Sequence, residues 1–394
     1  MLNHFIDWLE SLGVHIPGAG LLNYLSFRAM LAAVISMLIA FFAGGRIIRL
    51  LQRAQIGEDI RDLGLEGQMQ KKGTPTMGGL IIIAALLGAA LLVCRLDSIY
   101  TLLLIVTTLW CGAIGFADDY IKVFRHNKEG MSEHGKLILQ FGLGLFIALT
   151  VCISPTIPTD RLVTTIPFVK AHEFDYSWLS PFRGQAGVYC SWGIYMLMII
   201  VVMLACTNGT NLTDGMDGLA AGTSAIAGVA LGIIAWLSGD ALDARYLNIM
   251  LIPGAGEVAI YMAAFVGALL GFLWYNTFPA QVFMGDTGSL TIGGIIGVTA
   301  VLIRKELLLP VLCGIFVMES MSVIIQRRYF KYTKRKYGEG RRVFLMAPLH
   351  HHYQKQGIPE PRIVTRFWII GIILAVSTLA LLKIREEKQR WQES

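Results

Sequence analysis

Residues 207–219 read TNGTNLTDGMDGL, a polar stretch between the apolar run 194–206 and a second apolar run that begins at Leu219. It holds two carboxylates, Asp214 and Asp217, among asparagines, threonines and three glycines. Polar groups at the end of a membrane span are costly unless they bind something polar. One Asp would fit an ordinary helix N-cap, but two Asp and two Asn fit a cap poorly. If a helix begins here, the i, i+3 spacing places both carboxylates on one face, where they suit a divalent cation, a phosphate–metal complex or a proton relay.

The composition indicates a membrane protein. The chain has 394 residues, of which 55% are hydrophobic and 15% charged, with a mean hydropathy of +0.60. A soluble domain averages about 25% charged residues. We therefore predict an all-α integral membrane protein, a polytopic bundle of about ten transmembrane helices. The net charge of +6 does not indicate nucleic acid binding, because the basic residues cluster in loops, as membrane topology requires.

The apolar runs set the predicted spans and their connections. We place spans near 24–44, 77–94, 100–117, 137–156, 189–207, 217–237, 257–275, 287–303, 307–326 and 367–383. The short turn 304–306 predicts a tight hairpin between the two spans that it joins. With no repeat or linker, residues 1–394 form one predicted domain. The six cysteines lack metal-binding spacing and are interpreted as buried apolar residues, with a disulfide between Cys152 and Cys190 left open.

The distribution of basic residues orients these spans. The loops on one side are 46–76, 118–136, 208–216, 276–286 and 327–366. They hold 6, 4, 0, 0 and 11 Lys and Arg residues, 21 of the 33 in the chain. We therefore predict that this side is cytoplasmic and that both termini lie outside. The basic and aromatic segment 322–345 reads either as a solvated extension or, as we favour, as an amphipathic helix among anionic headgroups.

Four further polar clusters fall on the same predicted cytoplasmic side. They are residues 71–79 with two lysines and two threonines, 118–122 with an acidic pair, 274–290 around Asp286, and 346–353 with three consecutive histidines. Taken alone, each has an ordinary structural reading, such as a positive flank, a charged helix end or a cap. The histidines are not a zinc signature, because neighbours on a regular helix point apart. Taken together, however, the clusters predict one site at one membrane face.

Five aspartates converge on this face, with lysines, asparagines and histidines: Asp118, Asp119, Asp214, Asp217 and Asp286. Oxygen ligands beside lysines suggest Mg²⁺ and a phosphate or pyrophosphate substrate. A site at the membrane surface suggests that one reactant is a lipid phosphate. The residue types therefore predict phosphoryl transfer from a soluble diphosphate to a lipid acceptor. A transporter is a rival, because acids in spans also mark ion pathways, but transporters place them near the midplane.

Five motifs resemble those of the phospho-N-acetylmuramoyl-pentapeptide transferases, the MraY family of bacterial peptidoglycan synthesis. They occur in family order and read KKGTPTMGG (71–79), GFADDYIK (115–122), NLTDGMDGL (211–219), NTFPAQVFMGDTGSL (276–290) and MAPLHHHY (346–353). The resemblance runs from about Leu25 to about Arg385. The stretch 327–345 looks longer and more basic than is usual in the family. The histidine block separates this family from its nearer rival, the sister transferases that hand N-acetylglucosamine-1-phosphate to the same lipid.

The resemblance implies the reaction and its setting. Phospho-MurNAc-pentapeptide would move from UDP-MurNAc-pentapeptide to undecaprenyl phosphate, giving lipid I and UMP, with Mg²⁺ required. Ten transmembrane helices, outside termini, a homodimer and a bacterial inner membrane location with the active site facing the cytoplasm are also implied. Direct attack by the lipid phosphate and a covalent aspartyl-phosphate intermediate both remain open.

The resemblance also implies roles for individual residues. Asp286 would bind magnesium, with Asp214 and Asp217 near the metal and the nucleotide. Asp118 and Asp119 would serve catalysis and the lipid phosphate, with Asp118 as the base, and His350 would also be catalytic. The expected substrate contacts are Lys71, Thr76, Lys122, Lys136, Asn211, Asp214, Asp217, Asn276, His351 and His352.

Overall fold

The computed structural model describes residues 2, 11–12, 18–54, 71, 73–125, 127, 129–157, 162–166, 173–247 and 249–383. The predicted loop 46–76 therefore lies largely outside the described residues. The long helices are α2 (Leu25–Arg53), α4 (Ile99–Phe124), α5 (Glu133–Ile153), α6 (Gly184–Thr213), α7 (Leu219–Gly239), α9 (Ala255–Asn276), α10 (Gly285–Leu302), α12 (Gly314–Tyr337) and α14 (Glu360–Lys383). The shorter elements are η1 (Ala19–Asn23), α3 (Gly79–Val93), β1 (Val163–Thr165), β2 (Glu173–Asp175), η3 (Tyr176–Leu179), α8 (Ala241–Leu247), η4 (Glu306–Leu308), α11 (Leu309–Leu312) and α13 (Leu349–Lys355).

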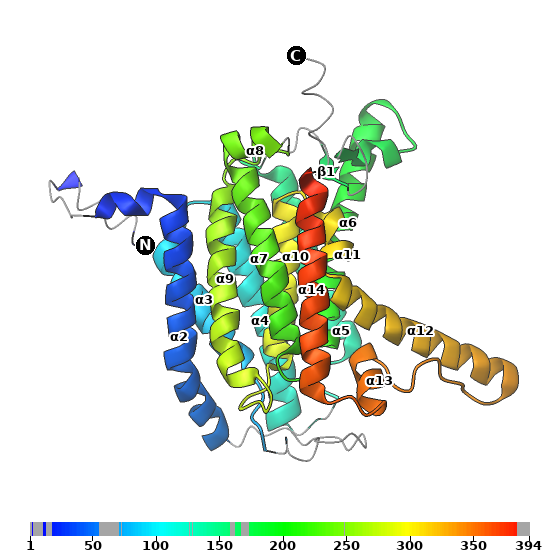
Figure 1. Ribbon diagram of the computed structural model, residues 1–394. Coiled ribbons are helices and arrows are strands. Elements are labelled where there is room, and N and C mark those ends of the chain that lie inside the picture. Colours follow the sequence, from blue (N-terminus) through cyan, green and yellow to red (C-terminus); the bar gives the residue numbers. More distant parts are fainter. Residues whose placement is uncertain are drawn as a thin grey trace.

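The helices confirm the predicted all-α polytopic bundle. Over the described ranges, eight helices are long and apolar enough to cross a membrane, or nine if one bent pair counts as a span. The run at 77–94 forms α3, which at 15 residues is shorter than the other spans. α8 and the β-hairpin lie at one end of the bundle and α13 at the other (Figure 1). All six cysteines are free thiols, so the disulfide left open is not formed.

The expected tight hairpin after residue 303 is wrong. The segment Glu306–Leu312 meets α12 at a bend of 78°, so the predicted span 307–326 is broken in two. The break falls at Cys313, next to Gly314, and glycine weakens helix continuity at such a point. α12 therefore leaves the bundle at an angle and runs to Tyr337, well past the predicted end of the span (Figure 1).

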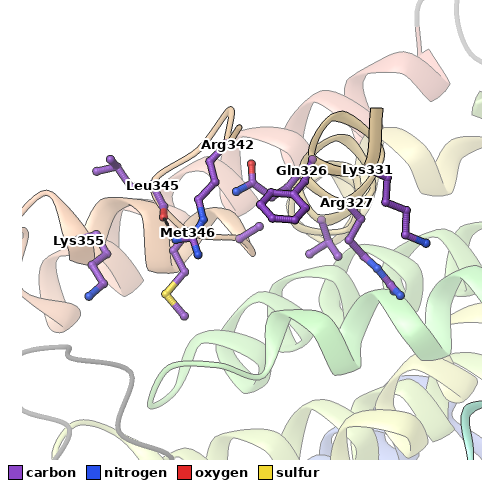
Figure 2. Close-up of a pocket in the computed structure, with 10 residues that line it drawn as sticks. Gln326, Arg327, Lys331, Arg342, Leu345, Met346 and Lys355 are labelled. Atoms are coloured by element: carbon purple, nitrogen blue, oxygen red, sulfur yellow. Dashed lines mark hydrogen bonds between the residues drawn. The ribbon is translucent and has the colours of Figure 1, made fainter. Parts of the chain in front are cut away.

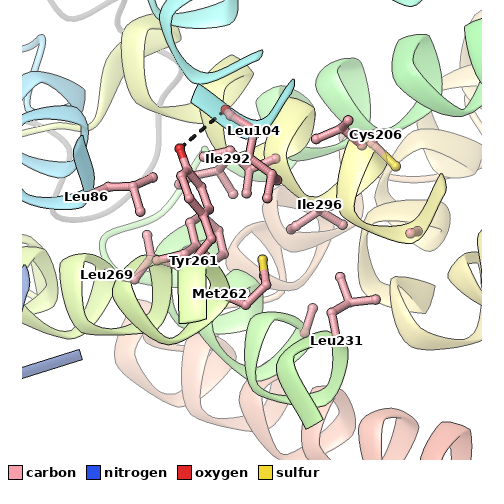
Figure 3. Packing of buried hydrophobic residues seen from close by; sticks show 14 of the residues in the cluster. Leu86, Leu104, Cys206, Leu231, Tyr261, Met262, Leu269, Ile292 and Ile296 are labelled. Carbon is pink, nitrogen blue, oxygen red and sulfur yellow. Dashed lines mark hydrogen bonds between the residues drawn. The ribbon is translucent and has the colours of Figure 1, made fainter. Parts of the chain in front are cut away.

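Helix α10 lies at the centre of the bundle and packs against α3, α4, α6 and α7. Its apolar side chains join a buried cluster in which Ile292 and Ile296 face Tyr261 and Leu231 from neighbouring helices (Figure 3). The Tyr261 hydroxyl group forms a hydrogen bond with Thr108 Oγ1 at 2.7 Å. Close packing and satisfied polar groups stabilise helix association in lipid, where burial of apolar surface adds little. The centre of the bundle is therefore a rigid support for the ends of α10.

Two glycines allow neighbouring helices to touch the first turn of α10. A Cβ at Gly79 in α3 would overlap the backbone of Gly288, and a Cβ at Gly115 in α4 would overlap the carbonyl of Asp286. Only glycine permits backbones to approach this closely. These contacts bring the motifs at 71–79 and 115–122 against the motif that contains Asp286.

The stretch 207–219 folds differently from the expected loop. α6 continues through Asn208 to Thr213, and Asp214 is its C-cap. The polar side chains remain helical because Thr207, Thr210 and Thr213 each donate a hydroxyl hydrogen bond to the carbonyl four residues earlier. No helix begins at Asp214, so Asp214 and Asp217 flank a turn before α7 and do not share a helical face. The predicted loop 208–216 is therefore mostly the last two turns of a span.

Candidate active site

Three carboxylates gather where α4 ends and α10 begins. Asp118 and Asp119 lie in the last turns of α4, and Asp286 lies in the first turn of α10. One oxygen from each lies within 4.8 Å of the others, which makes this a group that could hold a metal ion. The Asp118 side chain is fully buried and that of Asp286 is 14% exposed. Buried acids at such separations repel one another strongly unless cations compensate them.

Asp119 holds the two helices together. Its Oδ1 accepts the backbone N–H of Asp286 at 3.1 Å, and its Oδ2 accepts the N–H and the hydroxyl of Thr287 at 2.9 and 2.6 Å. The Asp119 carboxylate of α4 thus caps the positive N-terminal end of α10. Thr76 lies at the same junction, because a Cβ on Gly285 would be 3.0 Å from its hydroxyl and within 2.6 Å of Asp119. Both Asp119 oxygens are therefore occupied in positioning Asp286.

Two lysines bridge the other two carboxylates. Lys122 Nζ is 2.7 Å from Asp118 and 3.1 Å from Asp286, and Lys136 Nζ is 2.9 and 2.7 Å from the same two groups. Asn211 donates to the second Asp286 oxygen at 2.8 Å. Three carboxylates with two ammonium groups leave a formal charge of −1. Oxygen donors with this excess charge fit a hard divalent cation such as Mg²⁺.

A second polar network forms beside the turn 214–218. Lys71 Nζ lies 2.7 Å from Asp217 and 2.6 Å from Glu360, the first residue of α14. Glu360 also accepts the backbone N–H of Asp217 at 2.7 Å, and the second Asp217 oxygen accepts the N–H of Ala280 at 3.0 Å. Asn276 accepts the N–H of Gly218 at 3.0 Å. Asp217 is thus held in a separate network from the Asp118–Asp119–Asp286 group.

Glu360 was not anticipated from the sequence, although a signal for it exists. It is a buried acid between Pro359 and Pro361, at the start of an apolar span. An acid in that position is favourable in the first turn of a helix, so the sequence gives no reason to expect long-range partners for it. Its contacts with Lys71 and Asp217 join the start of α14 to two of the motifs.

The three histidines lie on the short helix α13 and point to different partners. His350 is fully buried, with Nδ1 3.2 Å from the Glu319 carboxylate of α12, and its backbone N–H also donates to Glu319 at 3.2 Å. His351 is partly buried, and burial, with the nearby His350 and Lys71, lowers the pKa of its ring to about 4. His352 accepts the backbone N–H of Leu345 at 3.1 Å. The histidines thus have distinct surroundings, as expected for neighbours on a helix.

Glu319 is a second residue that the sequence reasoning missed. It is a lone acid in the apolar half of α12, which is a recognised sign of function within a span. Its carboxylate lies beside the imidazole of His350 and accepts the His350 backbone N–H, so it positions the ring. The other ring nitrogen, Nε2, faces Gly215, where an added Cβ would overlap it. His350 is therefore brought against the turn that joins Asp214 to Asp217.

We expect Gly215→Ala to lower turnover by about 10²-fold. The added methyl group would overlap the His350 ring, so the ring must move away from its position. The backbone of Gly215 does not require glycine, so the fold should survive. A matched control is Gly193→Ala in α6, where an added Cβ meets no atom within 4 Å. Steady-state assays of both variants, with unfolding temperatures, test this expectation. Wild-type turnover in Gly215→Ala would contradict it.

The comparisons with known proteins agree with this geometry. The chain matches the family described as glycosyl transferase family 4 over residues 101–304, and the phospho-N-acetylmuramoyl-pentapeptide-transferase signature 1 over residues 71–83. It is 54% identical to the phospho-N-acetylmuramoyl-pentapeptide-transferase of Parabacteroides distasonis, and 51% identical to that of Flavobacterium psychrophilum. Each alignment covers 98% of this chain and 100% of the relative.

Proposed function

The chain belongs to the phospho-N-acetylmuramoyl-pentapeptide transferases, and from this we propose that it transfers phospho-MurNAc-pentapeptide from UDP-MurNAc-pentapeptide to undecaprenyl phosphate, giving lipid I and UMP. The observation that carries the proposal is the identity of about half of all residues over whole-length relatives of that name. The N-acetylglucosamine-1-phosphate alternative has no such support. The transporter alternative is also disfavoured, because the carboxylates gather at the ends of helices and not at mid-span.

We propose that Mg²⁺ is held by Asp286 with Asp118 beside it. These two carboxylates have oxygens directed toward partly exposed lysine side chains, whereas both oxygens of Asp119 accept backbone or hydroxyl hydrogen bonds. When bound, the cation neutralises charge on the diphosphate. Asp214 and Asp217 were expected to be ligands as well. Asp217 is engaged by Lys71, which supports a role on the substrate side of the site instead.

The residues around Asp118 suit the acceptor phosphate. In this proposal Asp118 accepts the proton of the lipid phosphate, and Lys122 and Lys136 bind the phosphate oxygens. Each ammonium group already lies between two carboxylates and can exchange one of them for a phosphate. An oxygen of the lipid phosphate then attacks the β-phosphorus of the donor, and the bond to the UMP oxygen breaks. Because Met131 N–H and two ammonium groups hold Asp118, we favour direct attack over a covalent aspartyl intermediate.

The second network suits the donor. Lys71 lies 5.9 and 6.0 Å from the ring centres of Phe278 and Phe283, so an aromatic and cationic surface adjoins Asp217. Such a surface can accommodate a base and a phosphate together. The remaining proposed donor or phosphate contacts are Thr76, Asn211, Asn276, His350, His351 and His352.

The setting of the enzyme is proposed in the same way. The apolar helices and the relatives place the chain in a bacterial membrane as a multi-pass protein. The basic residues of the predicted loops support a cytoplasmic site in the inner membrane. A homodimer follows from the family resemblance alone, and mass photometry of the purified protein tests it.

One assay tests the reaction and its route. Purified protein in detergent receives UDP-MurNAc-pentapeptide, and UMP release is measured with and without undecaprenyl phosphate and Mg²⁺. We expect release only when acceptor and metal are both present, and none with UDP-N-acetylglucosamine as donor. Release of one UMP per enzyme without acceptor would refute direct attack. Turnover of UDP-N-acetylglucosamine without turnover of UDP-MurNAc-pentapeptide would refute the assigned substrate.

A further inference from the structure

Helix α12 changes character along its length after it leaves the bundle. Its first half is apolar and exposes Met318, Met321, Ile324 and Ile325. Its second half, QRRYFKYTKRKY (326–337), alternates basic and aromatic residues, and four of its aromatic side chains are exposed. Aromatic and basic residues together occupy the headgroup layer of a bilayer, above an apolar layer. The composition therefore places the far end of α12 at the membrane surface.

The chain then turns back along α12 and is fastened to it. Gln326 accepts the backbone N–H groups of Val343 and Phe344, both at 3.0 Å, and donates to the carbonyl of Phe344 at 3.1 Å. Thr333 accepts the N–H of Arg341 at 2.8 Å. These four hydrogen bonds hold the returning segment 341–344 beside the helix. A groove forms between the helix, this segment and α13.

This groove has a volume of about 620 Å³ and combines cations with apolar walls (Figure 2). Its basic residues come from three segments: Arg327 and Lys331 from α12, Arg342 from the returning segment, and Lys355 from α13. Its apolar residues are Val323, Phe330, Leu345, Met346 and Ala347. No carboxylate lines the groove, and among the residues that the structure places, none forms an ion pair with Arg327, Lys331 or Arg342.

Arg327, Lys331 and Arg342 place three like charges without an ion-pair partner in one groove, which is unfavourable without an anion. A phosphate monoanion or diester satisfies guanidinium and ammonium groups at once. The apolar walls favour an anion that carries hydrocarbon over a fully hydrated one, because burial of apolar surface adds to the charge interaction. Over the described ranges, none of Arg327, Lys331 and Arg342 pairs with Asp118, Asp119 or Asp286, so these three cations are separate from the three carboxylates.

We propose that this groove binds the headgroup of an anionic phospholipid, with the phosphodiester between Arg327, Lys331 and Arg342. The start of an acyl chain would lie along Phe330 and Met346. The proposal does not rest on the transferase reaction. The aromatic residues place the basic end of α12 at the depth of the lipid headgroups, and an anionic headgroup would be its ligand there. The segment 345–347 leads directly into α13, so an occupied groove also braces the helix that carries His350.

Native mass spectrometry of the full-length protein in detergent tests the proposal. The probes are dimyristoyl phosphatidylglycerol and dimyristoyl phosphatidylcholine, each offered singly and in competition. We expect wild type to retain the anionic lipid at least about tenfold better, from three cations near the phosphate. Arg327→Gln/Lys331→Gln/Arg342→Gln should lose this preference. The matched control, Arg328→Gln/Lys334→Gln/Arg335→Gln, removes the same charge from exposed positions of α12 outside the groove and should keep the preference.

Several outcomes would overturn the proposal. Equal loss in both triple variants would mean that diffuse surface charge attracts the lipid, and no loss in either would mean that there is no site. Displacement of the lipid by 10 mM inorganic phosphate, about a hundredfold above the lipid concentration, would indicate a site for soluble anions. Displacement by an equal amount of undecaprenyl phosphate would assign the groove to the acceptor. The unfolding temperature and the detergent-phase UMP release of each variant show that it is folded, and they separate this test from that of the reaction.

Discussion

Asp286→Asn is expected to abolish transfer, with a fall in kcat of about 10³-fold or more, while the fold is retained. The substitution removes a negative charge that faces Lys122, Lys136 and Asn211 together. An amide is a weak ligand for a hard cation. The two lysines remain paired with Asp118, so no buried cation is left alone and the bundle should unfold at nearly the wild-type temperature.

UMP release with undecaprenyl phosphate, donor and a range of Mg²⁺ concentrations measures this effect. Metal binding can be followed separately by the paramagnetic resonance of Mn²⁺ in place of Mg²⁺, and Asp286→Asn should lose it. Glu339→Gln, which removes an exposed carboxylate near the far end of α12, is the control and should behave as wild type. Full activity of Asp286→Asn at ordinary Mg²⁺ would contradict the assigned role, and so would unchanged Mn²⁺ binding.

Lys71→Met is expected to have the largest effect on stability. Lys71 is the only cation that pairs with Asp217 and Glu360 in the part of the chain that the structure describes. Methionine keeps most of the length of the side chain but leaves two largely buried carboxylates side by side. Removal of one partner from a buried ion pair costs about 3–5 kcal/mol, and the 17% exposure of Lys71 argues for the lower end of that range. The unfolding temperature should fall by several degrees, and transfer should be lost.

A double variant separates the structural role of Lys71 from its role in binding. In Lys71→Met/Glu360→Gln one of the two unpaired charges is also removed, so most of the lost stability should return. Activity should not return if Lys71 contacts the substrate. The single variant Glu360→Gln is the control, because its amide oxygen can still accept from Lys71 and from the Asp217 backbone. Recovery of turnover in the double variant would show that Lys71 only compensates the two acids.

The fold class was predictable because its signals are local. Apolar runs of span length and few charges define membrane helices wherever they occur, so α5, α7, α9 and α10 lie close to the predicted ranges, whereas α4 runs to Phe124, past the predicted end at 117. Helix ends were less predictable. Thr207, Thr210 and Thr213 satisfy their hydroxyl groups within their own helix, so α6 runs through a stretch whose composition resembles a loop. The bend before α12 falls beside Gly314, and one glycine in an apolar run is not a distinctive signal for a break.

The sequence by itself determined that this protein is a bundle of membrane helices with acidic, basic and histidine motifs at one face, because hydropathy and motif order are properties of the chain alone. Only the tertiary structure decided how these motifs divide. It joins Asp118 and Asp286 through two lysines, commits Asp119 to the start of α10, and sets Asp217 apart with Lys71 and Glu360. It also places Glu319 behind His350. Most of these pairings connect residues more than 30 positions apart, up to the 289 positions between Lys71 and Glu360. The close packing of helices at glycine contacts, which no local pattern records, brings them together.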